Sequence, residues 1–196
     1  MRRMLGAVLA PSLTLAVLSS SVVGLAACSG AGAGSSGGAP GASSAPPVAA
    51  SSPLPDVVAI APAVAALETV LGGVQRYFEI NAETTVVHLF VAVAGADGAP
   101  PHAVSYSYLG STLSPVPTDL GEATGPTLTA AELTFDPAKV LQGARAALPT
   151  TNLTRFVVIG GPDGPAYSID AQSASGGRLR VDVAIDGSVV DVVPVS

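Results

Sequence analysis

The stretch that decides the fold is RVDVAIDGSVV, residues 180–190. Apolar and polar residues alternate up to Asp186-Gly187, and valines resume directly afterwards. An Asp-Gly pair between alternating segments is a strong signal for a β-hairpin. We therefore predict two antiparallel strands over residues 178–185 and 188–193.

This hairpin brings two carboxylates together. A two-residue turn would place Val183 opposite Val190 and Asp182 opposite Asp191, and like charges directly across a ladder are unfavourable. Either Arg180 or another cation neutralises the pair, or the aspartates form a weak cation site, or the register differs. Asp182 and Asp191 are therefore candidate site residues, with a solvated edge as the simplest expectation.

Similar patterns recur upstream of this stretch. Residues 153–160 and 166–173 flank Gly161-Pro162-Asp163-Gly164 and predict a second hairpin. Residues 84–94 are rich in valine, and residues 102–109 alternate with Tyr106 and Tyr108 on one face. We predict a strand for each of these two segments.

The chain between these strands is less regular. Residues 111–126 are rich in Pro, Thr and Gly, and we predict a loop there. For residues 127–135 a strand is the favoured interpretation. The alternative is a helical turn, because Thr129 and Glu132 have capping-box spacing.

Two segments have helical periodicity. Between Pro62 and Phe78 the apolar residues recur at steps of three and four, with Gly72-Gly73 inside the predicted helix. A second helix follows Asp136, a good N-cap, and ends at Pro149.

The predicted fold class is α+β, with helices packed on an antiparallel sheet. Residues 56–196 form a single domain with two possible halves, 56–126 and 127–196, each a helix followed by antiparallel strands. Val70-Leu71-Gly72-Gly73 matches Val140-Leu141-Gln142-Gly143 at an offset of 70 residues, which would lay Val86-Val87 on Phe156-Val157. A duplication is one explanation of this match, and chance is the other.

A helix followed by antiparallel strands that end in the hairpin at residues 180–190 resembles the PepSY-type modules of secreted bacterial proteins. The resemblance covers about the last 60 residues. It implies a small extracellular α+β domain, possibly in tandem, that binds or restrains other proteins without catalysis.

The N-terminus predicts export. Residues 1–27 combine Arg2 and Arg3 with a long apolar stretch, as in a secretion signal. Leu25-Ala26-Ala27-Cys28 resembles the lipobox of bacterial lipoproteins, and the composition resembles that of actinobacterial proteins. The resemblance implies cleavage before Cys28 and a lipid with fatty acyl chains such as palmitate on its sulfur. The chain would then be anchored to the outer face of the cell membrane.

Residues 28–55 are predicted to be a flexible linker after the lipidated cysteine, because Gly, Ala, Ser and Pro dominate them. The linker glycines match dinucleotide-binding and nucleophile-elbow patterns, but the strand and helix that those motifs require are absent from the sequence around them. A single transmembrane anchor is the alternative to the lipobox.

Charge and residue types exclude several functions. Without Arg2 and Arg3 the chain keeps six basic side chains against 14 acidic ones, a net charge of −8 that repels nucleic acid. Cys28 is the only cysteine, so no thiol is left for catalysis or metal binding. His88 is a weak candidate for a base or metal ligand, because no partner has ligand spacing. We expect no catalytic residue, no cofactor and no metal.

Three functions follow from these observations, in order of preference. The first is a non-catalytic envelope module that binds or modulates another envelope component. The second is a carrier or sensor of lipids or other apolar ligands, which would need a cavity of several hundred Å³ between sheet and helices. The third is an enzyme of unrecognised type, which would need a cleft that joins His88 or His102 to a carboxylate.

Overall fold

The fold is known from a computed structural model that describes residues 52–195. The predicted signal peptide, the lipobox at Leu25–Cys28 and nearly all of the predicted linker lie outside these residues, so they stay predictions. In the described part of the chain, no helix is long and apolar enough to cross a membrane.

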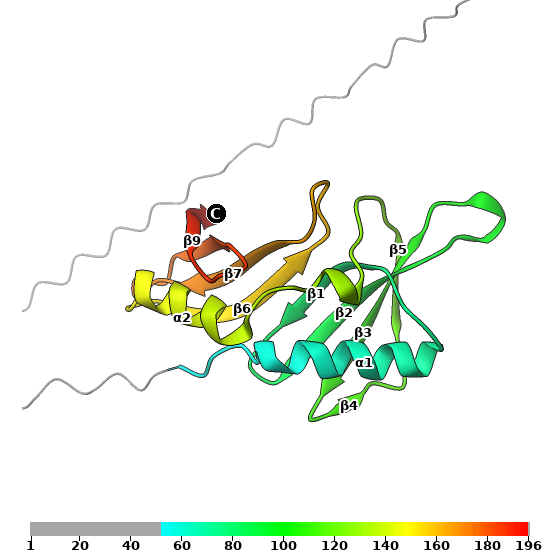
Figure 1. Ribbon diagram of the computed structural model, residues 1–196, viewed down its shortest axis with the longest axis horizontal. Coiled ribbons are helices and arrows are strands. Elements are labelled where there is room, and N and C mark those ends of the chain that lie inside the picture. The colour runs from blue at the N-terminus through cyan, green and yellow to red at the C-terminus, as the bar shows by residue number, and fades with distance from the viewer. Residues whose placement is uncertain (1–51, 196) are drawn as a thin grey trace, which may run out of the picture. The chain divides into compact units, whose positions relative to one another are not determined.

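The described residues form one nine-stranded sheet in which all neighbouring strands are antiparallel (Figure 1). The strand order is β4-β3-β2-β1-β6-β7-β8-β9, and β5 also pairs with β3. The strands are β1 (Tyr77–Ala82), β2 (Val86–Val93), β3 (His102–Leu109), β4 (Thr112–Leu113), β5 (Thr118–Glu122), β6 (Asn152–Ile159), β7 (Ala166–Gln172), β8 (Arg178–Val183) and β9 (Val189–Val195).

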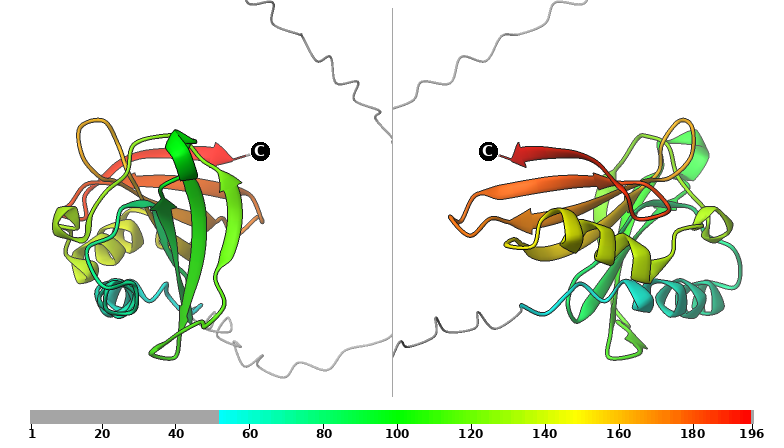
Figure 2. Two further views of the ribbon diagram at one scale, coloured as in Figure 1. Left: turned by 90° about the vertical axis from the view of Figure 1, so that its right-hand side faces the viewer. Right: turned by 60° about the vertical axis from the view of Figure 1, so that its left-hand side comes forward.

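Two α-helices, α1 (Ile60–Leu71) and α2 (Pro137–Ala147), lie on the same face of the sheet in the described chain (Figure 2). Short 3₁₀ turns η1 (Val57–Ala59), η2 (Ala96–Gly98) and η3 (Ala130–Glu132) complete the elements. Asp136 caps α2 as predicted, because its carboxylate accepts from the N–H groups of Ala138 and Lys139.

The predicted helix over residues 62–78 is wrong at its C-terminal end. Gly72 adopts the left-handed conformation with φ 78° and ends α1, as glycine commonly does after a helix. Val74 is then 75% exposed, and Phe78 belongs to β1. By chance, apolar residues continue at helical spacing beyond Gly72-Gly73, so the sequence predicted a helix where β1 begins.

Strand β1 is the centre of the sheet although the sequence did not predict it. It pairs with β2 on one side and with β6 on the other. Buried on both faces, it joins the two predicted halves into one continuous sheet. The predicted strands over residues 84–94 and 102–109 are confirmed as β2 and β3, and the hairpin of β6 and β7 is confirmed as well.

The decisive hairpin at residues 180–190 forms, but its turn is one residue longer than predicted. The N–H of Ala184 bonds to Ser188 and the N–H of Gly187 to Ala184, so the loop holds three residues, with Gly187 at φ 86°. Val183 consequently pairs with Val189, and the predicted pairing with Val190 is wrong. A register shift between Asp182 and Val183 then restores the predicted pairing of Asp182 with Asp191.

Two further predictions are wrong. Residues 111–126 contain β4 and β5, because their backbone pairs with the free edge of β3. Residues 127–135 contain the three-residue turn η3 in place of the favoured strand, and only Leu128 pairs with the sheet, in an isolated bridge to Tyr77. Thr129 and Glu132 form the capping box that the alternative interpretation required, since the side chain of each accepts the backbone N–H of the other.

The core lies between the two helices and the sheet. Its largest fully buried side chains are Tyr77, Phe156, Ile60, Leu67, Ile80, Leu89, Leu128, Leu153 and Ile169. Phe135 packs against Phe156 and Tyr167 at ring-centroid distances of 5.1 and 5.3 Å. These side chains fill the middle of the layer between helices and sheet. At the edge of that layer, a hollow of about 560 Å³ is lined by Pro62 of α1 and by Val87 and Tyr108 of the sheet.

The α+β class is confirmed, with each helix followed by four or more antiparallel strands. The 70-residue offset does not follow the order of elements. It lays Val86, in the second strand after α1, on Phe156, in the first strand after α2.

Candidate functional site: the helix-free face of the sheet

The face of the sheet opposite the helices carries a row of mostly polar side chains. Strand alternation sends Leu89 and Val91 toward the helices and therefore sends His88 to the helix-free face. Successive pairings then place seven residues side by side across the sheet, in the order Ser107, His88, Asn81, Val157, Ser168, Asp182 and Asp191. We call these residues the cross-sheet row.

All three weak candidates from the sequence thus lie in one row. His88 occupies one half of the sheet, and Asp182 and Asp191 occupy the other. Asn81, Val157 and Ser168 lie between them, so the structure aligns the candidates without bringing His88 into contact with either aspartate.

The middle of the cross-sheet row is buried although no helix covers it. Asn81 is 3% exposed and Ser168 is 7% exposed. The Nδ2 of Asn81 donates to Glu79 at 2.7 Å, but its Oδ1 is buried with no hydrogen-bond partner among residues 52–195. An unpaired buried acceptor costs about 1–3 kcal/mol. Asn81 is therefore a polar side chain that this face buries at a cost in stability.

His88 has a modest local role. Its Nδ1 lies 3.1 Å from the hydroxyl of Ser107 on the neighbouring strand. His102 lies 3.3 Å from Asp119, and these side chains are 39% and 62% exposed. That pair joins a histidine to a carboxylate on the outer strands β3 and β5, away from the cross-sheet row.

Asp182 of β8 and Asp191 of β9 face each other as predicted, beyond the longer turn and its register shift. The carboxylate of Asp191 accepts the N–H of Val192 at 2.8 Å. Among residues 52–195 neither aspartate forms an ion pair, and no group of three His, Asp or Glu side chains is arranged to hold a metal.

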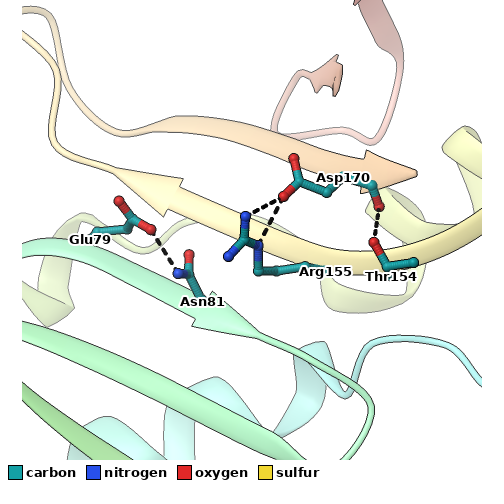
Figure 3. A network of polar contacts seen from close by, with 5 residues as sticks. All are labelled: Glu79, Asn81, Thr154, Arg155 and Asp170. Atoms are coloured by element: carbon teal, nitrogen blue, oxygen red, sulfur yellow. Dashed lines mark hydrogen bonds and ion pairs between the residues drawn. The ribbon is translucent and has the colours of Figure 1, made fainter. Parts of the chain in front are cut away.

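An ion pair borders the middle of the row (Figure 3). Arg155 of β6 donates from Nε and Nη2 to one carboxylate oxygen of Asp170 of β7, at 2.9 and 2.5 Å. The hydroxyl of Thr154 donates to the carbonyl of Asp170 at 3.1 Å. Because Asp170 is only 19% exposed, the pair is partly shielded from solvent. It fixes the Arg155 side chain against β7 on the helix-free face.

Two hollows open on this side of β7 and β8. The first, about 380 Å³, is lined by Arg155, Asp170 and Arg178 among others. The second, about 560 Å³, is lined by Arg180, Asp182 and apolar side chains that include Ile159. Both combine charged groups with aliphatic surface.

Arginine is concentrated on this face. Three of the five arginines after the predicted signal peptide, Arg155, Arg178 and Arg180, lie on β6 and β8 and point away from the helices. Arg178 and Arg180 are exposed and form no side-chain hydrogen bond or ion pair within residues 52–195. Two guanidinium groups are therefore available to carboxylates or other anions.

The groups with displaced pKa values lie outside the cross-sheet row. Burial and the neighbouring Glu68 raise the pKa of Tyr77 on the helix face. Backbone N–H donors lower the pKa of Asp119, Glu132 and Asp186, through Gly121, Thr129 and Ser188 respectively. The three lowered carboxyl pKa values therefore result from hydrogen bonds within turns and caps, and the raised pKa of Tyr77 results from its burial.

The sequence analysis missed Asn81, Arg155 and Asp170. Asn81 and its strand were hidden by the helical periodicity. Arg155 and Asp170 lie in strands that were predicted. Their opposite charges at outward positions of neighbouring strands could have indicated the ion pair. Comparisons of the chain with protein-family models, with curated proteins and with solved structures found no match.

Proposed function

We propose that this protein is a lipid-anchored, non-catalytic module of the cell envelope that binds a partner protein through the helix-free face of its sheet. The observation that carries the proposal is the exposure of Arg178 and Arg180, which have no side-chain partner in the described part of the chain. They lie beside a buried polar row in a chain of net negative charge.

The composition of this face suits a protein interface. Such interfaces are enriched in arginine and combine aliphatic surface with a polar rim. Here Ile159 and Val193 are 37% and 42% exposed beside the arginines. The partner we infer presents carboxylates to Arg178 and Arg180, because guanidinium groups bind carboxylates in a bidentate manner.

Placement in the envelope is inferred from the predicted signal peptide and from Cys28 as the lipidated residue. The same anchor would hold the helix-free face close to other envelope proteins, where a modest affinity is enough for binding. The full burial of the largest side chains in the middle of the layer between helices and sheet favours binding on the surface over the carrier function, for which only the hollow of about 560 Å³ beside Pro62 and Tyr108 speaks.

We also infer that the two halves share an origin and belong with the PepSY-type modules. The repeated order of a helix and antiparallel strands supports this, as does the direct pairing of β1 with β6, the first strand after each helix. PepSY-type modules imply binding without catalysis, which agrees with the proposed role.

A site-specific crosslinking experiment in the native cells tests the proposal. A photoreactive residue at Val193 on the helix-free face should give one discrete crosslinked protein, whereas Val70 on α1, which is 68% exposed, should not. Arg180→Glu should abolish the crosslink, and Arg76→Glu should leave it unchanged. Equal crosslinking from both faces, or a crosslink that survives Arg180→Glu, would rule out the proposed surface.

A further inference from the structure

We propose that the domain rests on the lipid bilayer through an apolar patch at the end where its chain enters the fold. This proposal depends on the lipid anchor that the proposed function assigns to Cys28. It adds the orientation of the domain on the membrane.

The patch surrounds the turn between β3 and β4. Two hollows of about 550 and 560 Å³ lie on either side of Leu109 and share Thr85, Val86 and Leu109 in their walls. The entry-end patch comprises Val58, Pro62, Val86, Leu109, Leu113 and Pro115.

The exposure of this patch is high for aliphatic side chains. Val58 is 70% exposed and Leu109 is 58% exposed. Protruding aliphatic side chains of this kind can insert into the boundary between lipid headgroups and acyl chains.

The charge around the patch distinguishes it from the rest of the surface. The residues that line the two hollows include a single charged side chain, Asp56, whose carboxylate accepts the N–H of Ala59. The chain after the predicted signal peptide carries 14 acidic residues, which anionic lipid headgroups repel. With Glu83 beside Asp56, this end carries two acidic residues of the 14, so its electrostatic repulsion from a bilayer is small.

The position of the patch relative to the predicted anchor selects the bilayer as its occupant. Asp56, at the entry of the domain, donates its N–H to Glu83, just before β2, so the entering chain and the patch share one end of the sheet (Figure 2). Only 23 residues lie between Cys28 and Ser52, so the two are at most about 85 Å apart even when the chain is fully extended. A tether of this length gives an effective concentration of about 1 mM, which makes a weak apolar contact significant.

Fluorescence quenching on vesicles tests the proposal. The chain contains no tryptophan, and Cys28 is its only cysteine. The chain that begins at Cys28 would be coupled through this thiol to maleimide-bearing lipid in vesicles of phosphatidylcholine and phosphatidylglycerol. With brominated acyl chains in the vesicle, Leu109→Trp should be quenched about twofold, since an inserted side chain reaches about 5–10 Å into the boundary region.

Matched variants separate insertion from proximity. Val190→Trp, at a position that is 70% exposed on β9, should show little quenching. Val58→Asp in the Leu109→Trp chain should remove most of the quenching, whereas Val74→Asp should not. Equal quenching of the two tryptophans, or none at Leu109→Trp, would overturn the proposal.

The chemical coupling keeps this result independent of natural lipidation. If Cys28 is not acylated in cells, the anchor proposal fails while the quenching still reports on the patch. If quenching is absent while Cys28 is acylated, only the docking proposal fails.

Discussion

Replacing Gly143 by alanine should destabilise the protein although it lies inside a helix. An alanine in a helix interior normally stabilises by up to about 1 kcal/mol relative to glycine. A Cβ at Gly143 would lie 1.7 Å from the carbonyl oxygen of Gly187 in the turn between β8 and β9. Both contacting groups belong to the backbone, so the helix or the turn must move. Overpacking of this kind costs about 1–3 kcal/mol.

We therefore expect Gly143→Ala to lower the free energy of unfolding by about 1–2 kcal/mol, and Tm by about 3–6 °C for a domain of this size. Urea denaturation followed by circular dichroism would measure the change. Gln142→Ala is the matched control, because Gln142 is exposed on the same helix and should change stability by less than about 0.5 kcal/mol. If Gly143→Ala proves as stable as the native protein or more so, the close contact between α2 and this turn does not exist.

Three further predictions follow from local geometry. Ser111 has φ 69° in the turn after β3, so Ser111→Gly should raise the free energy of unfolding by about 0.5–1 kcal/mol in urea denaturation, and a loss would contradict the strain. The pKa of Glu132 is lowered in the folded protein, so its contribution to stability is present above its unfolded pKa and is lost as the pH falls through the folded pKa. Glu132→Ala should therefore make the free energy of unfolding fall less steeply at acidic pH. An unchanged slope would argue against the cap. Strand β9 is at the edge of the sheet, where the carboxylate of Asp191 accepts the backbone N–H of Val192 and Pro194 has no N–H to donate. The double variant Asp191→Ala, Pro194→Val should therefore self-associate in analytical ultracentrifugation. A monomeric variant would show that other features protect this edge.

Local patterns were sufficient for most of the predicted strands and for the second helix. Alternation placed β2, β3 and the two C-terminal hairpins, and Asp136 with Pro137 placed the start of α2. The three-residue loop could not be predicted, because Asp-Gly suits both a two-residue turn and a turn with glycine at its last position. The position of Asp182 opposite Asp191 was nevertheless correct, since the irregularity near Val190 offset the longer turn.

The remaining errors concern contacts between distant parts of the chain. Strand β1 is stabilised by pairing with β6, about 75 residues later, and no local signal reports that pairing. For the same reason, no local pattern indicated that His88, Asn81 and Asp182 would share one row. The row is a property of the register across the sheet, which only the fold establishes.

Intact-mass spectrometry of the protein isolated from its native membranes tests the central proposal most directly. We predict a chain that begins at Cys28 and carries the added mass of a diacylglycerol thioether on that residue, and a Cys28→Ala variant that lacks the added mass. A mature chain that begins at another residue, or an unmodified Cys28, would contradict the anchoring on which both proposals depend.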